Sequence, residues 1–590
     1  MGILLILWAV VLNQSQINYA LVSQERTGND RQATGKGRQV TADLVLLGGR
    51  IWTGNSKLPE CEALAIWSGR ILAVGSDEVV RPLIGERTLV IALGGRRVVP
   101  GFHDSHVHFL GGGLSLARVQ LKDAPDEAEF GRRLQEFDRK LPRDRWLLGG
   151  DWDHDRTFAG KLPAADIVDR YVPARPVFLR RYDGHMALVN SVALKMAGID
   201  AATPDPPGGE IVRKPGSREP TGILRDNAMD LVARLVPEPA DEEIVEALQA
   251  AMRECARFGV TSVEDMDGSP TATRRRLLAA YQRAAREHKL TVRIGLWWPL
   301  AEWQALAQLG VQRGYGNDWV RLGGVKGFVD GSLGSSTAKM FEPYVHEPNN
   351  TGVFVTPPAR LEQWIRQADA ADLQIAVHAI GDRANAELLD IYERVAPGPA
   401  ARSRRFRVEH AQHLCTGDWQ RFGQLGVIAS MQPYHIVDDG RWAEARIGRE
   451  RCARSYMCRS LHEAGAVLAF GSDWPVAPLD PLAGIAAAVH RRTLDGRHPQ
   501  GWFPAQRISV ETALQAYTLG SAYAAGVEKD RGTLEVSKAA DLVVLSRDIL
   551  DPAEIECLDR AAVLLTVVGG RVVHIADPSL APRPAASAIP

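Results

Sequence analysis

The chain has 590 residues, 45% of them hydrophobic, so it is long enough to bury a large core and to form more than one domain. It carries 70 basic and 71 acidic residues, its formal net charge is −1, and no long basic run occurs. This balance argues against nucleic acid and against an anionic membrane surface as partners. A homodimer is one option for assembly.

The N-terminal segment has the pattern of a secretory signal. An apolar run over residues 2–12 is followed by polar residues and Ala20, which predicts a signal peptide over residues 1–20. No positive segment precedes the run, and a wrongly assigned start codon is the alternative. A signal would export the protein to the periplasm or out of the cell, and without one it would be cytoplasmic. Residues 21–41 are polar and aperiodic, which predicts a disordered linker.

Strand-like runs occur at both ends of the remaining chain. Residues 42–100 contain apolar runs broken by glycine pairs, as turns between strands are. Residues 540–545 and 564–573 have the same style of sequence. We therefore predict one small β-sandwich domain built from residues 42–100 and 526–577, followed by a disordered tail over residues 578–590. The alternative is a chance likeness, because β-rich sequences resemble one another.

A pair of histidines follows the first of these regions. His106 and His108 are two positions apart, and side chains at that spacing share one face of a strand, so both imidazoles can reach one cation. The mainly apolar residues 97–102 in front of them indicate a buried strand that ends in a polar mouth, where a barrel keeps its active site. Two structural histidines at the end of a strand would look the same, so the pair alone does not establish a metal site.

Short apolar strands and amphipathic helices alternate over residues 101–525. Residues 242–258 have a helical period, and apolar strands such as residues 260–263 lie between windows of this kind. Repeated strand–helix units predict an α/β fold, a (β/α)8 barrel of the TIM type. About nine candidate strands occur, one more than the barrel needs, and the extra one is assigned to an insertion at about residues 112–240. The Pro, Gly, Trp and charged residues of that insertion predict a lid over the mouth.

Single ligand-type side chains come directly after other apolar strands of this region. His378, His410 and Asp473 each follow such a run, which places them at the barrel mouth beside the histidine pair. Lys326 lies between that pair and His378 in the chain, four residues before Asp330. A buried lysine paired with Asp330 is the simplest interpretation of Lys326 taken alone.

With these segments in their order, the chain resembles the amidohydrolase superfamily, and more closely its family-3 branch, which includes N-substituted formamide deformylases. The resemblance covers about residues 42 to 575 and includes further runs that are specific to the branch. These runs are Pro-Pro-Gly-Gly-Glu-Ile-Val-Arg at 206–213, Pro-Thr-Gly-Ile-Leu at 220–224, Asp-Gly-Ser-Leu-Gly-Ser at 330–335 and His-Ala-Ile-Gly-Asp-Arg-Ala-Asn at 378–385.

The resemblance implies a role for each candidate residue. Asp473 would handle the proton of the attacking water, and Lys326 would be carbamylated, because carbon dioxide turns a lysine amine into an anionic oxygen donor. Neutral imidazoles and carboxylates suit zinc, iron or manganese, and one or two divalent ions, with zinc favoured, are expected. The implied metal ligands are His106, His108, Lys326, His378, His410 and Asp473.

Two positions depart from the branch, which has a histidine where this chain has Glu264 and an arginine where it has Ser336. Neither is an implied metal ligand, so both departures bear on substrate choice. His185, in the run Tyr-Asp-Gly-His, is a second catalytic candidate that could bind a substrate's carbonyl oxygen, and a histidine that only fixes the lid is the alternative. The other histidines, including His103, His154, His413 and His435, are predicted to be structural.

These features predict a metal-dependent hydrolase that cleaves a non-peptide carbon–nitrogen bond with an activated water. The partner would be a small-molecule substrate: an N-substituted amide, a formamide or a cyclic amide. A lactone or another ester is an alternative substrate for the same centre. A barrel that has lost turnover and acts as a binding or regulatory protein is a second class of function, which the intact set of ligand-type residues disfavours.

Overall fold

The computed structural model describes residues 40–143, 145–182, 184, 186–207, 209–397 and 403–585, without the side chain of Asp155. The predicted signal peptide and residues 21–39 of the predicted linker lie outside this set. Within it, no helix has both the length and the apolar character that a membrane crossing requires.

The centre of the fold is a parallel sheet of eight strands, each paired with the next along the chain. The sheet closes because Val107, at the end of its first strand, forms a parallel bridge with Trp474, just after its last. The Asp473 N–H also donates to the His106 carbonyl at 2.7 Å. The strands are β8 (Phe102–Val107), β15 (Val260–Asp265), β16 (Arg293–Pro299), β17 (Val320–Phe328), β18 (Ile375–Ala379), β19 (Arg407–His410), β20 (Ile428–Met431) and β21 (Leu468–Phe470). The predicted α/β barrel is therefore confirmed.

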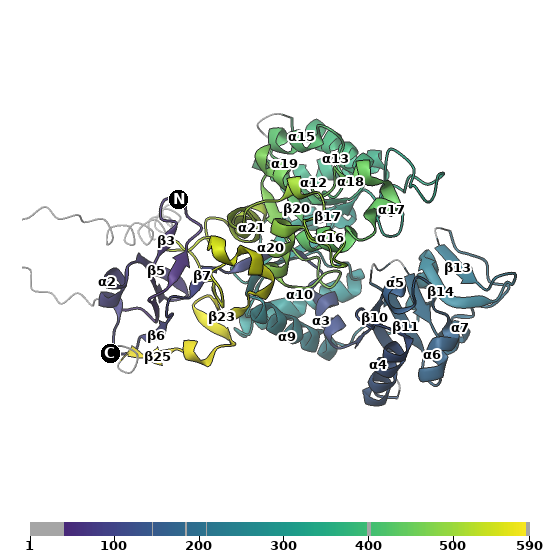
Figure 1. The fold of residues 1–590 in the computed structure, drawn as a ribbon, viewed down its shortest axis with the longest axis horizontal. Coiled ribbons are helices and arrows are strands. Elements are labelled where there is room, and N and C mark those ends of the chain that lie inside the picture. The colour runs from purple at the N-terminus through teal and green to yellow at the C-terminus, as the bar shows by residue number, and fades with distance from the viewer. Residues whose placement is uncertain are drawn as a thin grey trace, which may run out of the picture. The chain divides into compact units, whose positions relative to one another are not determined.

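Amphipathic helices alternate with these strands (Figure 1). In α9 (Asp241–Arg257) the apolar residues recur every three or four positions, which buries Ile244, Leu248 and Ala251. The Glu243 carboxylate accepts the Ala240 N–H at 2.8 Å and so satisfies a donor at the start of this helix. The other helices of the barrel include α3 (Phe109–Leu116), α10 (Thr271–Arg286), α12 (Pro358–Ala370), α13 (Asp382–Val395), α15 (Asp418–Leu425), α16 (Pro433–Asp439), α19 (Cys458–Glu463) and α20 (Pro481–His490).

The insertion after the first barrel strand has its own six-stranded sheet, in the order β13-β14-β12-β11-β10-β9. Neighbouring residues of β11 face opposite sides of this sheet, since Leu179 packs in one hydrophobic cluster and Phe178 in another. The prediction of a single spare strand here was wrong, because these strands are short and interrupted by Gly and Pro. The elements are β9 (Val119–Gln120), α4 (Glu127–Lys140), β10 (Leu147–Trp152), α6 (Ala165–Tyr171), β11 (Val177–Arg181), β12 (Met186–Val189), α7 (Ser191–Ala197), β13 (Gly209–Arg213) and β14 (Pro220–Asp226).

Two further sheets enclose a separate hydrophobic cluster, and both contain strands from the two ends of the chain. In one of them β22 pairs antiparallel with β7, with Leu542 opposite Pro100. The first sheet has the order β25-β6-β1-β4-β5 and the second β24-β23-β22-β7-β2-β3. Their strands are β1 (Leu44–Leu47), β2 (Arg50–Trp52), β3 (Glu60–Cys61), β4 (Ala63–Trp67), β5 (Arg70–Gly75), β6 (Leu89–Ala92), β7 (Arg97–Pro100), β22 (Leu542–Leu545), β23 (Val563–Val568), β24 (Arg571–Ile575) and β25 (Arg583–Pro584).

The predicted disordered tail is wrong for its described part. Leu580 is fully buried in the cluster between the two sheets, and Arg583 and Pro584 form β25, which pairs with β6. One apolar side chain and an open sheet edge therefore hold the tail in place as far as Ala585, which donates its N–H to the Thr88 carbonyl at 3.1 Å.

A buried ion pair joins the barrel to the second of these sheets. Arg293, on β16, donates to both carboxylate oxygens of Asp541, at 2.8 and 3.0 Å, and the two side chains are 6% and 5% exposed. Burial alone would raise the pKa of Asp541, but Arg293 outweighs it and the pKa lies below its ordinary value.

Asp541→Asn should lower the midpoint of thermal unfolding, because it leaves the Arg293 guanidinium buried without its charged partner. Losing one member of a buried ion pair costs up to about 3–5 kcal/mol. Circular dichroism during heating measures the effect. Glu463→Gln, in the exposed Arg459–Glu463 pair, is the control and should leave the midpoint unchanged. Equal midpoints for Asp541→Asn and the wild type would contradict a stabilising role for this contact.

Candidate metal centre

The ends of several barrel strands surround a cavity of about 250 Å³. A barrel of parallel strands carries its active site at this face, because the carboxyl ends of all strands meet there. All the residues that the sequence analysis assigns to metal binding line this cavity: His106, His108, Lys326, His378, His410 and Asp473.

His106, His108 and Asp473 form the tightest group. Asp473 Oδ1 lies 3.1 Å from His108 Nε2 and 3.5 Å from His106 Nε2. One ligand atom from each of the three residues lies within 4.8 Å of the others, a spacing at which one ion can contact all of them. The spacing of the histidine pair therefore produces the expected arrangement at the end of β8.

The orientation of His106 is fixed from the protein interior. Its Nδ1 lies 2.7 Å from Glu409 Oε2, and Glu409 accepts from Arg407 Nε and from the Ser430 hydroxyl, each also at 2.7 Å. A carboxylate at Nδ1 places the imidazole proton there, which leaves the Nε2 lone pair directed into the cavity.

His410 is oriented in the same way, since its Nδ1 lies 2.8 Å from the amide oxygen of Gln432. Its ring centroid is 4.9 Å from that of His106 and 4.6 Å from that of His378. His378 Nε2 lies 3.0 Å from the carbonyl oxygen of Gly331 and donates to it. This contact leaves Nδ1 of His378 as the atom with a free lone pair.

Lys326 lies at the floor of the cavity, with Nζ 3.5 Å from His106 Nε2. Asp330 does not serve as its partner, because the Asp330 carboxylate accepts the backbone N–H groups of Lys339, Ile380 and Gly381 at 2.7 to 3.0 Å. Among the described residues, no ion pair of Lys326 within 4.0 Å occurs. The simplest interpretation of Lys326, a pair with Asp330, is therefore excluded.

Burial dominates the electrostatics of the cavity. It lowers the pKa of His106 to about 4 and that of His378 to about 3, with the Lys326 charge as a second cause in each case. Burial also lowers the pKa of Lys326 to about 8. Burial alone would raise the pKa of Asp473, but His106 and His108 outweigh it and hold that pKa well below its ordinary value. The site thus combines the neutral imidazoles of His106 and His378 with an ionised carboxylate.

These residues fit a divalent cation. Asp473 Oδ1 is buried and makes no hydrogen bond of acceptable geometry within the described part of the chain, although it lies beside two imidazoles. His106 also presents a lone pair there, so two acceptor atoms face each other across 3.5 Å. A cation between them would satisfy both, and nitrogen and carboxylate donors are those that zinc prefers.

His435 was predicted to be structural and was not among the candidate site residues. His435 lies on α16 and lines the same cavity, and its nearest ligand atom is within 4.8 Å of those of His410 and Asp473. A signal was present, because α16 follows β20 directly and so also begins at the barrel mouth. His103 and His413 behave as predicted, since they bond Glu264 and Ser455 and do not line the cavity.

The two departures from the family pattern also lie away from this cavity. Glu264 accepts from Trp297 Nε1 at 2.7 Å and lies 3.1 Å from His103 Nε2, and Ser336 lies 3.1 Å from His346 Nε2. Neither residue lines the cavity. His185 lies outside the described residues, and Tyr182, three positions before it, contributes to the cavity wall.

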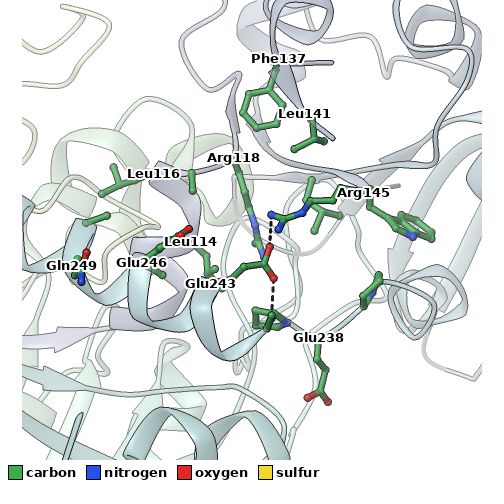
Figure 2. Close-up of a pocket in the computed structure, with 18 of the residues that line it drawn as sticks. Leu114, Leu116, Arg118, Phe137, Leu141, Arg145, Glu238, Glu243, Glu246 and Gln249 are labelled. Carbon is green, nitrogen blue, oxygen red and sulfur yellow. Dashed lines mark hydrogen bonds and ion pairs between the residues drawn. The ribbon is translucent and has the colours of Figure 1, made fainter. Parts of the chain in front are cut away.

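A larger cavity, of about 870 Å³, lies between α9 and the start of the insertion (Figure 2). Arg145 and Glu243 form an ion pair of 2.6 Å across it, and leucines and Phe137 make up much of its wall. No histidine or cysteine occurs among the described residues that line it. Among the described residues, the groups of His, Cys, Asp and Glu that lie close enough together to hold a metal ion all belong to the smaller cavity.

Known proteins resemble this chain over almost its whole length. It is 42% identical to the protein LONG AFTER FAR-RED 3 of Arabidopsis thaliana over 542 residues, which cover 91% of this chain and 92% of that protein. It is 28% identical to the N-substituted formamide deformylase of Arthrobacter pascens over 546 residues, 90% of this chain and 97% of that one. An uncharacterized metal-dependent hydrolase from Pyrococcus horikoshii OT3 matches the fold with a TM-score of 0.70 at 28% identity, covering 90% of this chain and 100% of that one.

The model of the amidohydrolase family matches residues 89–574, well over half of the chain. The matched range contains every side chain of the histidine cavity and all eight barrel strands. The resemblance stated from the sequence motifs is thereby confirmed, and the chain belongs to the amidohydrolase family, in its family-3 branch.

Proposed function

We propose that this amidohydrolase-family protein is a metal-dependent hydrolase of a non-peptide carbon–nitrogen bond, in an N-substituted amide, a formamide or a cyclic amide. The observation that carries the proposal is the group of imidazole nitrogens and one carboxylate oxygen that converge at the barrel mouth, where Asp473 Oδ1 is buried without a hydrogen-bond partner among the described residues. The likeness to an N-substituted formamide deformylase over 90% of the chain supports this bond type. Screening wild-type protein, loaded with metal, against amides, formamides, lactones and esters tests it.

His106, His108, His378, His410 and Asp473 would hold one or two divalent cations, with zinc favoured. A cation held there would polarise the substrate carbonyl and lower the pKa of water. Glu409 and Gln432 keep His106 and His410 in the tautomer whose Nε2 lone pair faces the cavity.

Asp473 would accept the proton of the attacking water and return it to the leaving nitrogen. Its carboxylate is ionised, 6% exposed and next to His108, so it is an available acceptor in a buried position. The proton must reach the nitrogen as the carbon–nitrogen bond breaks, because an amide anion is a poor leaving group. A lactone or another ester needs this step less, so ester hydrolysis is the second candidate for the same residues.

Lys326 would supply the remaining oxygen donor after carbamylation. An ammonium group 3.5 Å from His106 Nε2 would repel a cation bound by that nitrogen, whereas a carbamate would attract it. The neutral amine adds to carbon dioxide, forms a nitrogen–carbon bond and releases one proton, which converts the repulsive group into an anion. The absence of a carboxylate partner for Lys326 within the described residues favours this conversion.

Protein purified without chelator should contain one or two divalent cations per chain, with zinc as the main species. His106→Ala combined with His108→Ala should remove most of the metal and lower the thermal midpoint, because the remaining acceptors lose their shared cation. Elemental analysis and thermal unfolding measure both effects, with His462→Ala, an exposed histidine on α19, as the control. A metal-free, folded protein with full hydrolase activity would contradict the proposal.

Lys326→Ala should lose metal and activity, because it removes an oxygen donor from the site. Formate, acetate or propionate should restore part of the activity by occupying the space of the missing carbamate. The same acids added to wild-type protein are the control and should give no increase. Electron density that shows a bare amine on Lys326 in a crystal of metal-loaded protein would refute carbamylation.

Asp473→Asn should keep metal content near that of the wild type while kcat falls by about 10²- to 10⁴-fold, because the amide retains an oxygen but no longer accepts a proton. Asp418→Asn changes a buried aspartate that does not line the cavity and serves as the control. Steady-state kinetics and elemental analysis on the same preparations measure the two quantities. A fully active Asp473→Asn enzyme would assign the proton acceptor to another group, with His185 the next to test.

A further inference from the structure

Among the described residues that line the cavity, His435 is the one histidine whose role the ligand set does not explain. Its ring is stacked on that of His410, with centroids 6.4 Å apart and planes 11° from parallel. One of its nitrogens lies within 4.8 Å of ligand atoms of His410 and Asp473. Two roles are compatible with this position, a further metal ligand or a hydrogen-bond donor to the substrate, and they require different tautomers of the ring.

The partner of Nδ1 decides the tautomer of a neutral histidine, because a neutral imidazole carries its proton on one nitrogen only. Nδ1 faces a carboxylate oxygen in His106, 2.7 Å away, and an amide oxygen in His410, 2.8 Å away. Nδ1 therefore donates in both residues, and both rings present an Nε2 lone pair to the cavity. This is the state that a metal ligand needs.

Nδ1 of His435 faces a hydrogen-bond donor instead of an acceptor. Its Nδ1 lies 3.5 Å from the amide nitrogen of Gln412, a group that can donate a hydrogen bond and cannot accept one. Nδ1 must therefore be the acceptor, which places the proton on Nε2. That Nε2 is buried and has no hydrogen-bond partner among the described residues. The ring that carries this unpartnered N–H group lines a site in which His106 and His410 present lone pairs.

We propose that His435 is not a metal ligand but the donor that binds the carbonyl oxygen of the substrate through its Nε2–H and stabilises the negative charge that develops there during hydrolysis. This inference rests on the proposed function. A donor fixed in a buried position is more effective than one in water, because it needs no reorganisation as charge forms. Gln412 is then a positioning residue that sets the tautomer.

Two variants of His435 separate the roles. His435→Leu removes the donor, and His435→Gln keeps an amide N–H near the position of Nε2. Each is loaded with Co²⁺, and bound metal and the visible absorption spectrum of the resting protein are measured before kcat and KM. His413→Gln changes a buried histidine outside the cavity, whose Nε2 also has no partner in the described part of the chain, and serves as the control.

The expected result for both variants is a cobalt content and spectrum equal to those of the wild type. His435→Leu should lose about 10²- to 10³-fold in kcat, as removal of one oxyanion donor does, with a smaller change in KM, and His435→Gln should recover part of this loss. Loss of cobalt or an altered spectrum would make His435 a ligand and overturn the proposal. An unchanged kcat with a lowered thermal midpoint would overturn it in favour of a structural role.

The tautomer is measured without turnover, by ¹⁵N NMR of protein labelled in its histidine rings. The signal that disappears in His435→Gln should report a proton on Nε2, and Gln412→Glu should move that proton to Nδ1, because a carboxylate accepts there. A proton on Nδ1 of His435 in wild-type protein overturns the proposal for this residue alone. Failure of the wild type to hydrolyse any amide, formamide, lactone or ester would overturn the proposed function, and the role of His435 with it.

Discussion

Hydrogen-bond acceptors face one another in a buried cavity at the barrel mouth, and most of the site depends on this arrangement. His106 Nε2 and Asp473 Oδ1 are 3.5 Å apart with no proton between them, because the His106 proton is held at Nδ1 by Glu409. Unpaired acceptors in a buried site are costly unless something positive satisfies them. Two positive groups can do so: the Lys326 ammonium, 3.5 Å from His106 Nε2, and a divalent cation held between the two acceptors.

The side chains that hold this geometry carry a free-energy cost inside the barrel, because two of them are buried charges. Arg407 and Glu409 are both fully buried, and taking two charges out of water costs several kcal/mol per ion even when they pair. Apolar side chains would fill this layer with less penalty. The ion pair supplies a fixed carboxylate at His106 Nδ1. Burial alone would raise the pKa of Glu409, but Arg407 outweighs it and the pKa is about 2, so this carboxylate stays charged. Orientation of one imidazole therefore accounts for a buried charge pair that stability does not require.

The sequence predicted the barrel and the candidate ligands for a reason that can be stated. The ends of parallel strands converge, so a ligand-type residue directly after an apolar run is placed by topology alone, as with His378 and His410. His435 was not predicted to be part of the site because a turn of helix separates it from the end of β20. In such a segment the direction of a side chain depends on how the helix packs, which no local pattern records. The separate sheet of the insertion was not predicted because its strands are short, and because only β11–β12 and β13–β14 are hairpins while pairs such as β10–β11 and β12–β14 join segments farther apart in sequence.

Different parts of the structure determine the chemistry and the choice of substrate. The barrel strands fix the ligand-type atoms, whereas the cavity walls come from Tyr182 of the insertion, from Phe328 at the end of β17 and from Trp442 after α16. A volume of about 250 Å³ is smaller than that of most ligand sites, which begin at about 300 Å³. A substrate larger than this volume would extend out of the open cavity, past these aromatic side chains, or displace one of them. Because the walls come from loops and from the insertion, relatives with the same ligand set can differ in substrate without any change in the barrel.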